Sequence, residues 1–216
     1  DAARVPLTLA NFLRKYGRLE EAVARWRSGL AKAPQWDDSW RDLGLGLEHL
    51  NRTEEAADAY RQAVKAAPEK AENHRYLGSA LQDAGQLDEA LAAYGQAVGT
   101  DPENAEAHWG RFWVRALRGE FPKAWDDYEW RWKLRNRTTP ELDDSAPLWE
   151  GGDLSGQTFF LRAEQGYGDT IQTIRYAPVL AEMGATVKVG CPPALARLFA
   201  DAPGVSEVVA GNAGKV

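Results

Sequence analysis

The chain has 216 residues, enough for one large domain or two small ones. Its 26 basic and 32 acidic residues give a formal net charge of −6, and neither half is basic, which argues against binding to the phosphate backbone of nucleic acid. No apolar run approaches the roughly 20 residues needed to cross a bilayer, and the single cysteine excludes an internal disulfide.

Three histidines leave little material for a metal cluster, so we expect no bound metal. We expect a cytoplasmic protein. The chain begins with Asp1 rather than Met, which suggests a piece of a longer protein whose targeting signal would not be visible.

A period of 34 residues runs through the first part of the chain. Four series of residues recur at this spacing: Pro34, Pro68 and Pro102; Ala22, Ala56, Ala90 and Ala124; Trp26, Tyr60, Tyr94 and Tyr128; and Gly17, Asn51, Gly85 and Gly119. The last series holds residues that tolerate a left-handed backbone. Four series in phase predict a repeated structural unit.

Within one unit, residues 71–102, the pattern predicts two helices. Leu77 and Leu81 lie on one face of the first helix, which Gly85 ends as a left-handed cap. A second helix over 87–98 buries an apolar stripe, and Gly78 lets the neighbouring helix approach closely. Such a pair cannot bury its apolar face alone, so the units should stack into a solenoid.

This pattern resembles the tetratricopeptide repeat family, whose motif is W-x2-L-G-x2-Y…A-x3-F…A…P. The second unit reads Trp40-x2-Leu43-Gly44-x2-Leu47, followed by Ala56, Tyr60, Ala63 and Pro68. We therefore assign residues 1–136 to an α-helical solenoid with repeats at 3–36, 37–70 and 71–104 and a modified repeat at 105–136.

The resemblance implies a protein or peptide partner on a concave face lined by the first helix of each unit. The corresponding contact positions are Arg14, Arg41, Glu48, Arg75, Gln82, Trp109 and Trp113. Their three arginines would place cationic forks along the groove, suited to carboxylates. The alternative is that the arginines are solvated charges. His74 and His108 occupy the usual tryptophan position, where packing is the expected role.

Aromatic residues crowd the modified repeat. Trp125, Tyr128 and Trp132 share one helical face, as do Trp109 and Trp113. Such stripes are more often buried contacts than a ligand cage. We expect this cluster to seal the end of the solenoid and to dock whatever follows it.

The helical period stops after Leu134. Residues 137–156 are rich in Pro, Gly, Asp and Ser and form a linker, in which Trp149 is expected to anchor onto a neighbour. Residues 157–216 alternate between strand and helix. We predict strands over 158–163, 185–190 and 205–209, a helix over 169–183 that Pro178 kinks or breaks, and a helix over 193–200. This order predicts a small, incomplete, Rossmann-like α/β unit with parallel strands.

A glycine loop follows the first of these strands. Its glycines allow a ligand close to the backbone, and the next helix offers free N–H groups to an anion. The candidate ligand residues are Gly166, Tyr167, Gly168 and Thr170, with Arg162 and Glu164 as weaker candidates. Ile171 replaces the third glycine of G-x-G-x-x-G, so a nicotinamide or flavin fingerprint is not met. Cys191 is expected to be inert packing.

A wider order of motifs surrounds this loop: Tyr128 to Trp132, Pro147-Leu148-Trp149-x-Gly151, and Arg162 to Gln172. It looks like bacterial proteins in which tetratricopeptide repeats precede a GT-B-type glycosyltransferase, an O-GlcNAc-transferase-like architecture. The loop itself resembles that of the lipopolysaccharide heptosyltransferases. In that family the aspartate after the loop glycine is a proposed base toward the acceptor hydroxyl, and Asp169 matches it. The alternative is that Asp169 caps its helix, with Gln172 completing an approximate capping box.

Glycosyl transfer in this family needs two Rossmann domains, and the resemblance implies that the second holds the nucleotide sugar. Only the 60 residues 157–216 follow the linker, so we expect this chain alone to lack catalysis and cofactor. The partial sheet could dock on the solenoid, form a homo-oligomer across its open edge, or continue beyond Val216. Protein binding is the leading function. The alternatives are the N-terminal portion of a nucleotide-sugar-dependent glycosyltransferase, and an assembly role.

Overall fold

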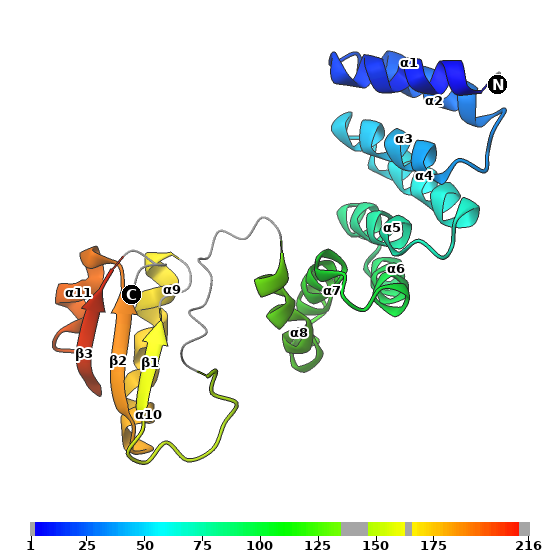
Figure 1. Ribbon diagram of the computed structural model, residues 1–216. Coiled ribbons are helices and arrows are strands. Elements are labelled where there is room, and N and C mark those ends of the chain that lie inside the picture. The colour runs from blue at the N-terminus through cyan, green and yellow to red at the C-terminus, as the bar shows by residue number, and fades with distance from the viewer. Residues whose placement is uncertain (1–2, 135–146, 163–165, 212–216) are drawn as a thin grey trace. The chain divides into compact units, whose positions relative to one another are not determined.

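The computed structural model describes residues 3–134, 147–162 and 166–211. The chain divides between Arg135 and Asn136 into two compact units, one helical and one α/β (Figure 1). The buried cores of the two units share no residue. Residues 137–146 of the predicted linker and Glu164 of the glycine loop lie outside the described residues.

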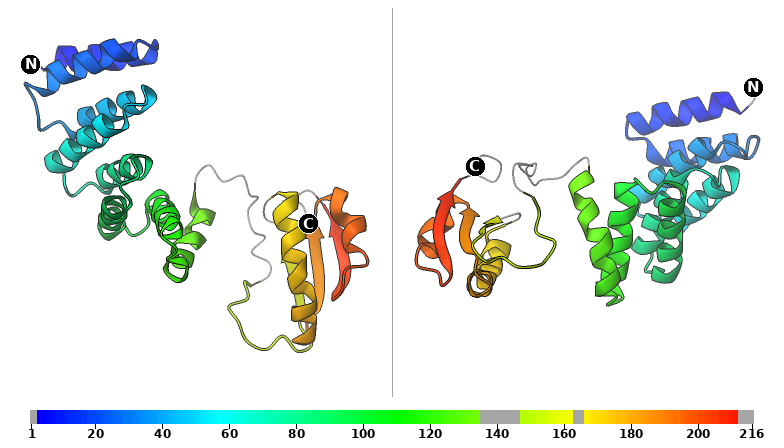
Figure 2. Two further views of the ribbon diagram at one scale, coloured as in Figure 1. Left: turned by 180° about the vertical axis from the view of Figure 1, so that it is seen from behind. Right: turned by 60° about the horizontal axis from the view of Figure 1, so that its bottom comes forward.

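The first unit consists of four helix pairs stacked in chain order (Figure 2). The pairs are α1 (Arg4–Lys15) with α2 (Leu19–Leu30), α3 (Asp37–His49) with α4 (Thr53–Ala66), α5 (Ala71–Asp83) with α6 (Leu87–Thr100), and α7 (Ala105–Leu117) with α8 (Phe121–Tyr128). Each first helix also contacts the first helix of the next pair. We call the surface lined by α1, α3, α5 and α7 the inner face.

The turn inside each pair has the left-handed residue that the period predicts. Gly17, Asn51, Gly85 and Gly119 have φ angles of +74°, +57°, +72° and +75°. After each of them the backbone N–H reaches back to the end of the first helix, as in the bond from the Gln86 N–H to the Leu81 carbonyl, 2.8 Å long. This is the helix-ending hydrogen bond of a Schellman motif.

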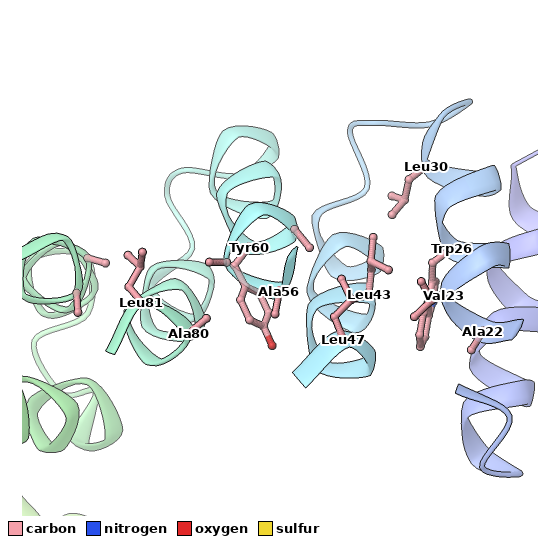
Figure 3. Close-up of a cluster of buried hydrophobic side chains, with 14 of the residues drawn as sticks. Ala22, Val23, Trp26, Leu30, Leu43, Leu47, Ala56, Tyr60, Ala80 and Leu81 are labelled. Carbon is pink, nitrogen blue, oxygen red and sulfur yellow. The ribbon is translucent and has the colours of Figure 1, made fainter. Parts of the chain in front are cut away.

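The repeated alanines and aromatics form the core of the stack. Ala22, Ala56, Ala90 and Ala124 are fully buried. Figure 3 shows Trp26 and Tyr60 between the helices of successive pairs. A methyl group on Gly78 would lie 2.9 Å from the ring of Tyr94, so this glycine is needed for the close approach predicted from the sequence.

The fourth pair differs from the other three. Its second helix, α8, has only eight residues and carries Pro122 in its first turn, and the 3₁₀ turn η1 (Glu129–Lys133) follows it directly. Within η1, the indole of Trp130 stacks on the ring of His108, with ring centroids 3.9 Å apart. The modified repeat is therefore closed by a stacked tryptophan instead of a full second helix.

The second unit is a three-stranded parallel sheet in the order β1-β2-β3. Its elements are β1 (Thr158–Arg162), α9 (Tyr167–Thr173), η2 (Ile174–Tyr176), α10 (Ala177–Glu182), β2 (Thr186–Cys191), α11 (Pro193–Phe199) and β3 (Val205–Ala210). The predicted parallel pairing is confirmed. The helix predicted over 169–183 is broken before Pro178, which stands in the first turn of α10, where its missing N–H leaves no hydrogen bond unmade.

Alternating strand residues give this sheet one apolar face. Phe159 and Leu161 of β1 and Val187 and Val189 of β2 share a core with residues of α10 and α11. Leu154, which lies within the predicted linker, is 2% exposed and belongs to this core. The ring of Trp149 packs edge-on against Phe159, with centroids 5.6 Å apart, which gives the expected anchor.

Candidate functional site

The inner face carries a different side chain at the same position of each of the first three pairs. Arg14, Glu48 and Gln82 are separated by 34 residues and lie near the ends of α1, α3 and α5. All three are predicted groove positions. The chemistry of this surface therefore changes from a cation to a carboxylate to an amide along the stack.

Buried aromatics of the second helices reach the inner face with their polar atoms. The indole N–H of Trp26 donates to Oδ1 of Asn11 over 3.0 Å, and the hydroxyl of Tyr94 donates to Oε1 of Gln82 over 3.3 Å. The hydroxyl of Tyr60, at the equivalent position, is buried and has no hydrogen-bond partner. The sequence predicts these aromatics only as core residues, although Tyr60 and Tyr94 are spaced equally from Glu48 and Gln82.

The predicted arginine forks are not free to bind a ligand's carboxylates. Arg14 lies 3.7 Å from the carboxylate of Asp42. Arg41 contacts Asp38 at 2.8 Å and Glu72 at 3.5 Å. The sequence-based picture of a cationic groove is therefore wrong, because acids on the inner helices neutralise the arginines.

Arg75 is held in a similar way. Its guanidinium lies 4.1 Å from the centre of the Tyr76 ring and 3.9 Å from the carboxylate of Glu72. The ring of Tyr76 in turn stacks on Tyr60, with centroids 5.4 Å apart. Arg75 is thus part of a stacked assembly between α4 and α5, rather than a solvated charge as the alternative interpretation held.

A buried polar network joins the second and third pairs. Asn73 is fully buried, donates to Asp37 over 3.2 Å and accepts from Arg41 over 3.2 Å. Lys70 donates to the same carboxylate over 2.8 Å. Burial alone would raise the pKa of Asp37, but the hydrogen bonds from Lys70 and Asn73 outweigh it and hold that pKa below its ordinary value.

Glu48 has the opposite electrostatic environment. It is half-buried, and burial raises its pKa above the ordinary value, although the neighbouring Tyr60 hydroxyl opposes the shift. The carboxylate of Asp83 raises it further. Among the described residues Glu48 forms no ion pair, so the middle of the inner face has an uncompensated negative charge.

A cavity opens at the first pair, beside the turn between α1 and α2. Its volume is about 550 Å³, and most of its lining residues are polar or basic: Asn11, Arg14, Lys15, Gly17, Leu19 and His49. His49 directly follows Glu48 in the chain. A basic and an acidic part of the surface therefore meet at the C-terminal end of α3.

The aromatic cluster of the fourth pair is partly open. Trp109 stacks on Phe112 with centroids 5.1 Å apart, and Tyr128 packs against both rings. However, Trp113 is 46% exposed and Trp125 is 56% exposed. The prediction that the cluster is buried is wrong for these two residues, since nothing among the described residues of this unit covers them.

His108 belongs to a buried charge network. Its Nδ1 lies 2.7 Å from the carboxylate of Asp127, and its Nε2 lies 3.0 Å from the carbonyl of Pro102. Arg111 and Arg115 bind the same carboxylate at 2.5 and 2.6 Å. The predicted packing role of His108 is confirmed. The role of Arg111 was missed, because the motif indicates only that it replaces a leucine.

In the second unit, Asp169 does not cap its helix. Helix α9 begins at Tyr167 with Gly166 at the N-cap, so Asp169 lies in the first turn and is exposed. A side chain on Gly166 or Gly168 would meet no atom within 4 Å. The hydroxyl of Thr170 donates to the Gly166 carbonyl over 3.0 Å. The capping interpretation is therefore wrong, and the acceptor-base role stays a prediction.

Metal ligands and membrane spans are both absent from the described ranges. Within residues 3–134, 147–162 and 166–211, no group of three or more His, Cys, Asp or Glu side chains is arranged to hold a metal ion. No helix in the same ranges is both long enough and apolar enough to span a bilayer.

Comparison with known families identifies the repeats. Residues 7–71 match a model described as tetratricopeptide repeat, and residues 78–111 match one described as TPR repeat. The chain has no match among curated proteins.

Solved structures with a similar fold include several of MamA. A crystal structure of MamA protein is 21% identical, covers 60% of this chain and 70% of its own, and superposes with a TM-score of 0.57. MamA 41-end from Desulfovibrio magneticus RS-1 is 21% identical, covers 59% and 72%, and has a TM-score of 0.54. At this identity the likeness concerns the fold alone. The helical unit of this chain is therefore a solenoid built from tetratricopeptide repeats.

Proposed function

We propose that the helical unit binds a segment of another protein on its inner face. The observation that carries this proposal is the variation at Arg14, Glu48 and Gln82. The repeat needs its glycines, alanines and aromatics at fixed positions to pack, and those positions recur from pair to pair. It does not need a cation, a carboxylate and an amide at one equivalent surface position, so their variety is available for recognition.

The neighbouring surface also supports peptide binding. Trp113 is exposed on α7, and tryptophan is enriched among residues that dominate binding energy. A peptide lying along the inner face would meet the polar cavity at α1, the carboxylate of Glu48, the amide of Gln82 and then aromatic surface. This sequence of chemistries favours a segment with defined order over a uniform charged ligand.

Selection of peptides from a displayed random library on the immobilised chain tests the proposal. Peptides that bind the inner face should bind Gln82→Ala and Trp113→Ala more weakly, by about tenfold for a residue at the centre of the contact. The matched control is Gln96→Ala, because Gln96 is exposed on α6, a second helix. Affinities are measured by fluorescence anisotropy, and far-UV circular dichroism checks that each variant is folded.

Equal binding to Gln82→Ala, Trp113→Ala and Gln96→Ala would place the contact elsewhere and refute the proposal. Failure to select any peptide against the folded chain would refute it as well.

Nucleotide-sugar-dependent glycosyl transfer by a longer protein is a second candidate, which the loop resemblance implies. It is supported by the order β1-β2-β3 with parallel pairing, which suits part of a doubly wound sheet, and by the open space around the loop glycines. Calorimetric titration with nucleoside diphosphates tests it. Saturable binding that is lost in Gly168→Val would favour it. That variant should still fold, since its added side chain meets nothing within 4 Å.

A further inference from the structure

We propose that the inner face recognises a basic side chain, a lysine or arginine of the partner, which inserts beside Glu48 between α3 and α5. The inference rests on the proposed function, because it names the chemistry of the segment that the same face would bind. The site consists of the Glu48 carboxylate, the Tyr60 hydroxyl and the Asp83 carboxylate.

Charge balance around Glu48 favours a cationic ligand. Each of the three predicted groove arginines already has a carboxylate of this chain: Arg14 has Asp42, and both Arg41 and Arg75 have Glu72. Glu48 and Asp83, in contrast, form no ion pair among the described residues. The charges left for a partner in this region are therefore negative, which selects against acidic ligands and for cationic ones.

The buried hydroxyl of Tyr60 is a second, independent observation. Its side chain is fully buried, and the oxygen has no hydrogen-bond partner in the folded chain. Most buried polar atoms in folded proteins are satisfied, so an orphaned one needs an explanation. In the next pair the equivalent tyrosine, Tyr94, is satisfied by Gln82. The difference between the two pairs is that Glu48 stands where Gln82 does.

The geometry indicates how a cation would complete this site. The Tyr60 ring lies against Gly44 of α3, one helical turn before Glu48, so its hydroxyl and the carboxylate approach the same surface point. An ammonium or guanidinium group there would pair with the carboxylate and donate to the hydroxyl oxygen. Arg75 does not fill this role, because its guanidinium is stacked on Tyr76.

The electrostatics of the free protein agree with this geometry. Burial raises the pKa of Glu48, which means that the folded chain holds this charge at a cost. A partner's cation would remove that cost on binding, and a neutral or acidic residue would not. The interaction would then contribute specificity, because an unpaired charge in the complex disfavours the wrong partner.

Labelled peptide pools test the proposal with the full chain. One position of each pool is fixed as Lys, Arg, Gln or Glu, and all other positions are randomised over uncharged residues. We expect the Lys and Arg pools to bind more tightly than the Gln pool by about tenfold, and the Glu pool to bind most weakly. Glu48→Gln should abolish the preference for Lys and Arg while leaving the affinity of the Gln pool unchanged.

Two matched variants distinguish a contact at Glu48 from the overall charge of the chain. Glu54→Gln removes one negative charge from an exposed site on the second helix α4, so it should leave the preference intact if the effect is local. Tyr60→Phe keeps the ring and removes only the hydroxyl, and it should weaken the Lys and Arg pools without weakening the Gln pool.

The outcomes separate this inference from the proposed function. If pools bind and are weakened by Gln82→Ala, but Glu48→Gln does not change their preference, the basic-residue inference is wrong and the proposed function stands. If Glu54→Gln reduces the preference as much as Glu48→Gln does, the attraction is the general charge of an acidic protein and the inference is also wrong. If no pool binds the folded chain, both fail.

Discussion

Asp127 is a single carboxylate shared by three side chains of α7. It is 1% exposed and contacts His108, Arg111 and Arg115. Replacing it by asparagine would leave the two arginines without their charge partner inside the fourth pair. We expect Asp127→Asn to lower the free energy of unfolding by about 3 kcal/mol in urea denaturation. Asp126→Asn, at the exposed neighbouring position, should change it by less than about 0.5 kcal/mol.

The same carboxylate gives stability a defined dependence on pH. Burial would raise the pKa of Asp127, but the hydrogen bonds from Arg111 and His108 outweigh it and hold the pKa below its ordinary value. Its contribution is therefore complete above the ordinary aspartate pKa and is lost as the pH falls through the lower, folded-state value. Urea midpoints measured from neutral pH down to pH about 3 should fall less steeply in Asp127→Asn.

Glu48 should show the opposite sign. Because burial raises its pKa, the ionised carboxylate destabilises the folded chain at pH values above that raised pKa, and the penalty disappears on acidification through it. Glu48→Gln should therefore raise the urea midpoint at neutral pH. An unchanged or lower midpoint would mean that the charge is satisfied within the chain, and it would also weaken the case for a cationic partner.

Tyr60 and Tyr94 form a matched pair for testing the orphaned hydroxyl. Removing the hydroxyl of Tyr94 breaks its hydrogen bond to Gln82, so Tyr94→Phe should cost about 0.5–1.5 kcal/mol. Tyr60→Phe removes a buried oxygen that has no partner, so it should be neutral or stabilising. Equal losses in thermal and urea unfolding would show that the Tyr60 hydroxyl has a partner in the free protein.

At the scale of the helices, close packing depends on the absence of a side chain at a few glycines. A methyl group on Gly110 of α7 would collide with the ring and hydroxyl of Tyr94. Gly110→Ala should therefore destabilise the helical unit by about 1–3 kcal/mol. Gly95 of α6 has no atom within 4 Å of such a group, so Gly95→Ala should stabilise the unit by about 0.5–1 kcal/mol through helix propensity. Chemical denaturation of both variants measures the difference.

The helix pairs themselves could be predicted from the sequence because their signals are local. Gly85 ends α5 and Pro178 breaks the helix before α10, and both effects depend on the backbone of one residue. The pairing of Arg41 could not be predicted in this way. Its partners Glu72 and Asn73 are about thirty residues away and reach it only because α3 and α5 are neighbours.

The candidate site was predictable in position but not in character. The repeat period places Glu48 and Gln82 on the inner face, whereas burial and pairing decide which of their charges and hydrogen bonds are already used. The exposure of Trp125 has a similar explanation. Helical spacing puts it on one face with Tyr128, but spacing is the same whether or not another element covers that face.

At the scale of the whole chain, the two units have separate cores, and the only cysteine belongs to the second. Cys191 is buried and burial raises the pKa of its thiol, so reaction with Ellman's reagent should require the second unit to open. Phe199→Ala removes a buried ring from the same core and should accelerate labelling by at least about tenfold. Asp127→Asn should leave the labelling rate unchanged. Acceleration by both variants would show that the cores unfold together.

The equivalence of Arg14, Glu48 and Gln82 has a consequence for how such a chain can diverge. Each residue occupies the same place in its own duplicated unit, while the packing residues around it are held nearly constant. A mutation at one of these places can alter what a single unit prefers without disturbing its neighbours. New selectivity could therefore be acquired stepwise, one unit at a time, and protein engineers could recombine units in the same manner.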